Sequence, residues 1–200
     1  MNPLHLEHLA TDEWRATLRE RVLPFAFGAL TPAALGANVL EVGPGPGLTT
    51  DLLSRELDQL TAIEIDRELA AALAARMAGA GAGAAAGAVV EVVEGDATAM
   101  PFEDRQFTGA VTFAMFHHVP SADLQDLVLA EIFRVLRPGG LLIANDSVAS
   151  EELAAFHIDD IYNPVDPATL GDRLRTIGYT DVTVRINPYA WACHARRPPA

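Results

Sequence analysis

The chain has 200 residues, 50% of them hydrophobic, which is enough to bury one substantial core in one domain. Its formal net charge of −13 opposes binding to phosphate backbones and anionic membranes, so neither nucleic-acid nor membrane partners are expected. The single cysteine, Cys193, excludes an internal disulfide. The N-terminus has no signal-like segment, and no apolar run reaches about 20 residues. We therefore expect a cytoplasmic protein that is a monomer or a homodimer.

The predicted elements alternate between helix and strand over residues 1–200, which is typical of a doubly wound, mostly parallel α/β sheet. A helical cap over residues 1–30 comes first, with a helix that Thr11 caps and that stops before Pro24. Helices then follow at 47–57, 66–77, 121–137 and 167–177, capped in the last three cases by Asp66, Ser121 and Asp166. Seven strands are expected at 39–42, 60–64, 89–94, 107–116, 141–144, 180–186 and 189–195, the last two as a closing antiparallel hairpin.

Residues 78–88 contain only alanine and glycine. Side chains no larger than a methyl group bury little area, so this stretch is predicted to be a flexible loop between the second helix and the third strand. No function is expected of it.

Three glycines, Gly43, Gly45 and Gly47, follow the first predicted strand. Without Cβ atoms the backbone can approach a ligand closely, and the start of the next helix offers unpaired N–H groups to an anion. A dinucleotide fingerprint needs glycine where Leu48 stands, so a nicotinamide-dependent oxidoreductase is the weaker interpretation. Glu41, two residues before the first glycine, is better tolerated beside a ligand that carries an ammonium or sulfonium group.

The pattern E-x-G-x-G-x-G over residues 41–47 resembles the first motif of the class I S-adenosylmethionine-dependent methyltransferases. Further landmarks of that family follow in order, among them acids that end the second and third strands and the sequence R-V-L-R-P-G-G at 134–140. The resemblance extends from about Trp14 to Cys193. It implies a Rossmann-like methyltransferase fold with S-adenosyl-L-methionine as the cofactor, and it places Glu41 and the three glycines at the cofactor.

The resemblance implies further cofactor contacts at the ends of three strands. Glu64 stands about 20 residues beyond the glycine turn, where a carboxylate can accept hydrogen bonds from both ribose hydroxyls. Ile65 is then expected to pack on the adenine ring. Asp96 and Ala97 match the positions that bind the adenine amino group and a ring nitrogen, although Asp96 as a turn cap is the alternative. Ala114 is placed to offer its backbone carbonyl to the methionyl ammonium.

Two adjacent histidines, His117 and His118, follow the fourth predicted strand and are the candidate catalytic residues. The sulfonium methyl is already activated, so a general base is needed only for an acceptor whose proton has a high pKa. His118 fits the commoner position of a histidine in the family. A role in shaping the pocket or bonding to backbone is the favoured alternative for both. Within residues 146–165, His157 and Tyr162 are the candidate substrate-binding residues.

Missing residues argue against several subclasses of the family. Enzymes that methylate DNA amino groups carry a Pro-Pro motif after the fourth strand, where this sequence has Ala-Met-Phe-His at 114–117. Catechol-type enzymes hold Mg²⁺ with an Asp after strand four and Asp-Asn after strand five, whereas here strand five ends Asn145-Asp146, so no metal is expected. The sequence thus favours methyl transfer to an O, N or C atom of a small neutral or cationic acceptor. The alternative is a non-catalytic module that binds S-adenosylmethionine or S-adenosylhomocysteine.

Overall fold

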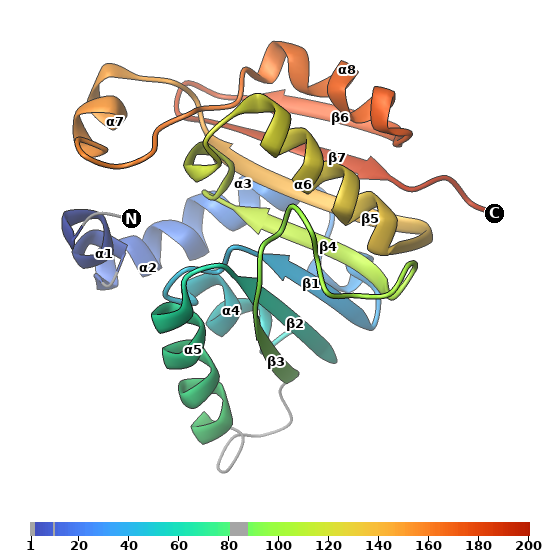
Figure 1. The fold of residues 1–200 in the computed structure, drawn as a ribbon, viewed down its shortest axis with the longest axis horizontal. Coiled ribbons are helices and arrows are strands. Elements are labelled where there is room, and N and C mark those ends of the chain that lie inside the picture. Colours follow the sequence, from blue (N-terminus) through green and yellow to red (C-terminus); the bar gives the residue numbers. More distant parts are fainter. Residues whose placement is uncertain (1–2, 10, 81–87) are drawn as a thin grey trace.

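The structure is a computed structural model and describes residues 3–9, 11–80 and 88–200. Its strands form one seven-stranded sheet in the order β3-β2-β1-β4-β5-β7-β6 (Figure 1). The first five pair in parallel, and β7 runs antiparallel between β5 and β6. The predicted fold, with its closing hairpin, is confirmed. The strands are β1 (Asn38–Val42), β2 (Gln59–Glu64), β3 (Val89–Glu94), β4 (Phe107–Phe113), β5 (Leu136–Ser147), β6 (Thr180–Ile186) and β7 (Ala190–Arg196).

Helices cover both faces of this sheet. The α-helices are α1 (Pro3–Leu9), α2 (Asp12–Thr17), α3 (Leu23–Phe27), α4 (Leu48–Leu53), α5 (Arg67–Ala80), α6 (Ala122–Val135), α7 (Glu151–Phe156) and α8 (Pro167–Ile177). Shorter turns are the π-helical η1 (Leu18–Val22) and the 3₁₀-helical η2 (Pro32–Leu35) and η3 (Phe116–His118). Among the described residues, no helix is long and apolar enough to cross a membrane.

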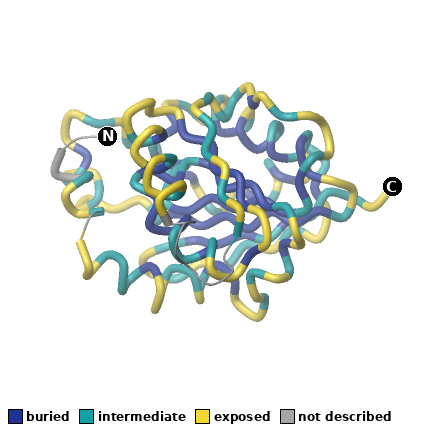
Figure 2. Tube along the Cα trace, turned by 90° about the horizontal axis from the view of Figure 1, so that it is seen from below, coloured by how far each residue is buried: buried dark blue, intermediate teal, exposed yellow. Residues whose placement is uncertain are grey.

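The core lies in two layers because successive side chains of a strand point to opposite faces of the sheet. In β5, Leu142 packs with α6 and α8, whereas Ile143 packs on the other side with α3 and α4. The parallel strands β1 and β4 are buried on both faces, as their continuous apolar runs predict. Figure 2 shows this buried centre, with the exposed segments around its outside.

The helix caps expected from the sequence are present. Thr11, Asp66, Ser121 and Asp166 each accept a hydrogen bond from a backbone N–H two or three residues further along. Each side chain satisfies a donor that the first helical turn leaves unpaired. These caps fix where α2, α5, α6 and α8 begin.

The sequence predicted that the N-terminal helix stops before Pro24. This prediction was wrong. The helical path continues from α2 through the π turn η1 into α3, which contains Pro24. The N–H of Leu23 donates to the carbonyl of Leu18, five residues back. A π turn is wider than an α-turn, which relieves the clash between a proline ring and the carbonyl four residues before it.

Three other predicted boundaries were also wrong. Helix α4 ends at Leu53 rather than residue 57, because the N–H groups of Glu56 and Leu57 both turn back to the Leu53 carbonyl. Strand β4 ends at Phe113, before the turn at residue 114. Strand β5 begins five residues earlier than predicted, at Leu136, with an irregular stretch before its main pairing with β4. Of the predicted alanine–glycine loop, residues 78–80 belong to α5 and residues 81–87 lie outside the described residues.

Candidate active site

The glycine turn after β1 adopts backbone angles that favour glycine. Gly43, Gly45 and Gly47 have φ values of 67°, 55° and 82°. A Cβ on Gly43 would lie 2.2 Å from Cγ of Met115, and one on Gly47 would lie 2.3 Å from Cδ1 of Leu73. The turn is therefore held tightly against two of the protein's own side chains while its backbone faces a cavity.

Glu64 joins the end of β2 to this turn. Its Oε2 accepts a hydrogen bond from the Gly45 N–H at 2.8 Å, and its Oε1 accepts one from the Asp66 N–H at 3.0 Å. The side chain is buried. A carboxylate has about four lone-pair sites, so two backbone bonds hold it in place and leave acceptor capacity for a ligand.

A cavity of about 400 Å³ lies along the carboxyl ends of β1 to β4. This is where ligands bind in open α/β sheets, and the volume falls in the usual range for small-molecule and cofactor sites, roughly 300–1,000 Å³. Most of the predicted site residues line it together. These are Gly43, Gly45, Glu64, Ile65, Asp96, Ala97, Ala114 and His118.

Two of these lining residues, Ile65 and Asp96, have features that bear on their predicted roles. Ile65 is 68% exposed, which is unusual for a large apolar side chain and suits a residue that covers a ligand ring. Asp96 accepts hydrogen bonds through Oδ1 from both the N–H and the hydroxyl of Thr98, each at 2.8 Å. Asp96 thus caps a turn with one oxygen while it lines the cavity.

A second, smaller cavity of about 50 Å³ lies between the glycine turn and the N-terminal helices. Leu9, Trp14 and Leu18 line it from α1, α2 and η1. The ring of His8 on α1 packs edge-on against Phe156 on α7, with 5.6 Å between the ring centres. The N-terminal cap thus meets the segment after β5 beside the site. The two cavities share four lining residues, Gly43, Gly45, Ala114 and His118.

Glu41 lies behind the glycine turn and lines neither cavity. It is buried, and its two oxygens accept hydrogen bonds from the hydroxyls of Thr49 and Thr50 at the start of α4, the latter at 2.6 Å. Burial raises the pKa of Glu41 to about 7, against the lowering effect of these hydroxyls. The sequence placed Glu41 at the cofactor, whereas in the structure its side chain supports the start of α4 under the turn.

The two adjacent histidines occupy different environments on η3. His118 is half-buried and lines both cavities. His117 is buried, and both its backbone N–H and its Nδ1 bond to the carboxylate of Asp146, at 2.9 and 2.6 Å. Burial opposes protonation of His117, but the charge and hydrogen bond of Asp146 outweigh it and raise the His117 pKa. His117 thus lies behind His118, one layer away from the cavities.

The two candidate substrate-binding residues stack on each other instead of lining either cavity. The ring of His157, at the end of α7, lies 4.8 Å from that of Tyr162, with 26° between the planes. Asp160 and Ile161, from the same segment, line the larger cavity. The sequence placed this segment at the site but carried no signal for which of its side chains face inward.

The seven-stranded order and the glycine turn with its strand-end acids define a class I methyltransferase fold. Residues 40–144, just over half of the chain, match the family model described as a methyltransferase domain. The chain belongs to this family.

Individual relatives agree on the class but differ in what they modify. The chain is 32% identical over 130 residues to phthiotriol/phenolphthiotriol dimycocerosates methyltransferase 1 of Mycobacterium ulcerans, covering 65% of this chain and 45% of that protein. It is 38% identical over 72 residues to ribosomal RNA small subunit methyltransferase A of Aliivibrio salmonicida, covering 35% and 26%. It thus spans less than half the length of these relatives. A SAM-dependent methyltransferase structure from Aquifex aeolicus shares the fold, with a TM-score of 0.71 and 21% identity over 98% and 99% of the two chains.

Proposed function

We propose that this protein transfers the methyl group of S-adenosylmethionine to an O, N or C atom of a small-molecule acceptor. The observation that carries the proposal is the junction of the two cavities. The larger one brings the glycine turn together with Glu64 at the end of β2 and Asp96 just after β3, and the smaller one shares Ala114 and His118 with it. A cofactor cavity with a second space directly beside it is what a group-transfer enzyme needs.

The residues present fit the cofactor. Glu64, fixed by two backbone N–H groups, keeps lone pairs with which it would accept hydrogen bonds from ribose hydroxyls. The second carboxylate oxygen of Asp96 and the N–H of Ala97 would bind the adenine edge, with Ile65 over its face. When bound, the cofactor supplies a methyl group already activated on a sulfonium sulfur.

Ala114 would bind the amino-acid end of the cofactor through its backbone. It has a φ of 50°, unusual for a residue with a side chain, and its N–H donates to the Asn145 carbonyl at 2.9 Å. This conformation turns the chain at the end of β4, beside both cavities, where the Ala114 carbonyl would accept from an ammonium group. Glu41 would act indirectly, by holding the start of α4 under the glycine turn.

His118 is the titratable side chain among the four lining residues that the cavities share. We assign it the role of holding the acceptor and of accepting its proton when the acceptor atom carries one. His117, anchored by Asp146, would position η3 and hence His118, because their rings lie 4.1 Å apart. His157 and Tyr162 would support this wall from behind without touching the acceptor.

The acceptor class follows from the smaller cavity and from charge. Trp14, Leu18 and Phe113 give that small cavity apolar walls, and Thr49 and His118 add polar groups. A net charge of −13 disfavours an RNA acceptor, despite the ribosomal RNA relative. A small neutral or cationic acceptor fits both observations. We further propose that the protein acts in the cytoplasm, as a monomer or homodimer, without a nucleic-acid or membrane partner.

The competing function is a module that binds S-adenosylmethionine or S-adenosylhomocysteine without turnover. A cofactor cavity alone serves both functions, but a second cavity beside the methyl position is needed only by an enzyme. The test is a methyl-transfer screen against a metabolite library with S-adenosylhomocysteine as the readout. We expect its release to depend on one class of acceptor. Tight cofactor binding with no turnover on any acceptor would support the module instead.

A further inference from the structure

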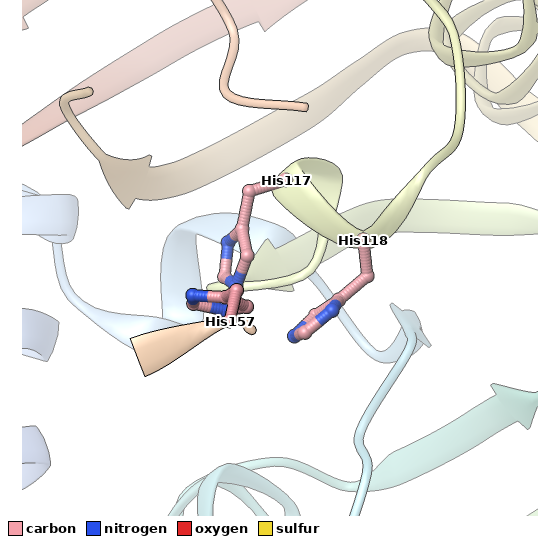
Figure 3. Close-up of side chains that lie close together, drawn as sticks. All are labelled: His117, His118 and His157. Carbon is pink, nitrogen blue, oxygen red and sulfur yellow. The ribbon is translucent and has the colours of Figure 1, made fainter. Parts of the chain in front are cut away.

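Three imidazole rings lie close together (Figure 3), and one of them, that of His118, lines both cavities. His117 and His118 come from η3, and His157 comes from the end of α7. One nitrogen from each ring lies within 4.8 Å of the others, and all three Nε2 atoms are buried. The ring centres of the three pairs are 4.1, 4.9 and 5.2 Å apart.

The surroundings of two of these rings fix which ring nitrogen carries the hydrogen. Nδ1 of His157 lies 2.6 Å from the carbonyl of Leu153, and a carbonyl can only accept, so Nδ1 carries the hydrogen. Nδ1 of His117 bonds to the carboxylate of Asp146. In the neutral form of each ring the lone pair is then on Nε2. Anchoring of Nδ1–H by a carboxylate or a backbone carbonyl is the arrangement that orients histidines bound to metals.

We propose that His117, His118 and His157 form a binding site for a divalent transition metal ion of the zinc class. Three imidazoles with a fourth position open to water or substrate are the ligand set of catalytic zinc sites. Nitrogen donors favour Zn²⁺ and its transition-metal neighbours over Mg²⁺ and Ca²⁺, which prefer oxygen. Because His118 also lines both cavities, the fourth position would face the space assigned to the acceptor. His118 would then bind the ion with the lone pair that otherwise accepts a proton, so the metal-bound protein would not use His118 as its general base.

The charges near the three histidines favour a bound cation, and the spacing of their nitrogens shows how far they must move to bind one. The carboxylate of Asp146 lies 2.6 Å from Nδ1 of His117, and Asp160 lines the larger cavity together with His118, so the neighbourhood favours a cation. Ligands in a tetrahedral zinc site lie roughly 3.3 Å from one another, so the widest pair of nitrogens has to close by about 1.5 Å from its present 4.8 Å.

This site goes beyond the proposed methyl transfer, and its test does not depend on turnover. The full chain, without an affinity tag, is stripped with a chelator and titrated with Zn²⁺ by calorimetry in the absence of S-adenosylmethionine. We expect one Zn²⁺ per chain with a dissociation constant of about 1 μM or lower. Co²⁺ should give the visible absorption of a tetrahedral, nitrogen-ligated ion, and Mg²⁺ should produce no heat.

The Zn²⁺ affinities of single variants show which side chains bind the ion. His118→Gln and His157→Gln should each weaken Zn²⁺ binding by about 100-fold or more, and Asp146→Asn by about 10- to 100-fold through the orientation of His117. His194→Gln, which removes a histidine of β7 that bonds to the Ala26 carbonyl outside the cluster, should leave the affinity unchanged. Circular dichroism and thermal unfolding of the stripped variants show whether each is folded. His118 is the least buried of the three, so its variant is the least liable to misfold.

Two outcomes would overturn the site. One is a folded wild-type chain that gives no heat with Zn²⁺ and leaves Co²⁺ with the spectrum of the hydrated ion. The other is Zn²⁺ binding that survives unchanged in a folded His118→Gln variant. S-adenosylmethionine binding measured on the same samples keeps the two proposals apart, because a failure of either leaves the other standing.

Discussion

The carboxylate of Glu64 accepts a hydrogen bond from the backbone N–H of Gly45 at 2.8 Å, so the end of β2 is tied directly to the turn after β1. Two features that lie 19 residues apart in the sequence thus form one rigid wall of the larger cavity. A carboxylate held in advance loses little conformational entropy when a ligand binds to it.

Replacement of Glu64 should therefore weaken cofactor binding. We expect Glu64→Ala to lose about 1.5–3 kcal/mol of S-adenosylmethionine affinity, tenfold or more, because charged hydrogen bonds to ribose hydroxyls are lost. Glu64→Gln keeps the shape and an oxygen acceptor, and should lose less. Calorimetry on the three proteins checks this order, and equal affinities would remove Glu64 from the site.

Gly43→Ala should destabilise the fold more than the backbone angle alone explains. Gly43 has a φ of 67°, and an added Cβ would lie 2.2 Å from Cγ of Met115. Gly139, with a φ of 79° and no heavy atom within 4 Å of an added Cβ, is the matched control. We expect Gly139→Ala to cost about 1–2 kcal/mol and Gly43→Ala a further 1–3 kcal/mol or so from overpacking. Urea denaturation measures both, and equal losses would show that Met115 moves aside freely.

The buried Glu41 should make stability depend on pH. Burial raises its pKa from an ordinary 4.5 to about 7, so between these values the folded state keeps a proton that the unfolded state releases. Glu41 therefore adds its full contribution to the free energy of unfolding below about pH 4.5. As the pH rises through 7 this contribution is lost, and the free energy of unfolding falls by roughly 3 kcal/mol in total. Glu41→Gln, which is neutral at every pH, should flatten this part of the curve. Parallel curves for wild type and Glu41→Gln between pH 5 and 8 would contradict the prediction.

His118→Asn should reduce turnover without weakening the cofactor. For an acceptor that must lose a proton, the loss of a general base costs about 10²- to 10⁴-fold in rate, whereas the residues assigned to adenosine are untouched. His194→Asn is a suitable control, because His194 lies on β7 and bonds to the Ala26 carbonyl, outside both cavities. Steady-state rates and cofactor calorimetry separate the two effects. Unchanged turnover would leave His118 with the pocket-shaping role that the sequence also allowed.

The cofactor side of the site could be predicted because its signals are local. Each contact belongs to one strand end, and parallel strands bring their carboxyl ends to the same edge of the sheet. Gly43, Glu64, Asp96 and Ala114, which the sequence predicted as cofactor residues, accordingly line one cavity together. The face on which Glu41 lies also follows from the sequence, because strand alternation puts it on the same side of the sheet as Val39, which packs with α3 and α4.

The acceptor side could not be predicted in the same way. His157 meets His117 and His118 only through the path of the segment after β5, about 40 residues further along the chain. Nothing in its own neighbourhood marks it as part of that cluster. The π turn that carries the helix through Pro24 is likewise a tertiary result, which brings Leu18 to the smaller cavity. Sequence spacing fixes which edge of the sheet is used, but not which side chains of a long connection face it.

The most direct test of the whole account is a crystal structure of the full chain with S-adenosylmethionine. We predict one molecule in the larger cavity, its ribose hydroxyls bonded to Glu64, its adenine amino group bonded to Asp96, and its methyl group directed toward the smaller cavity beside His118. An empty cavity at saturating cofactor, or a bound molecule with Glu64 and Asp96 turned away from it, would contradict the account.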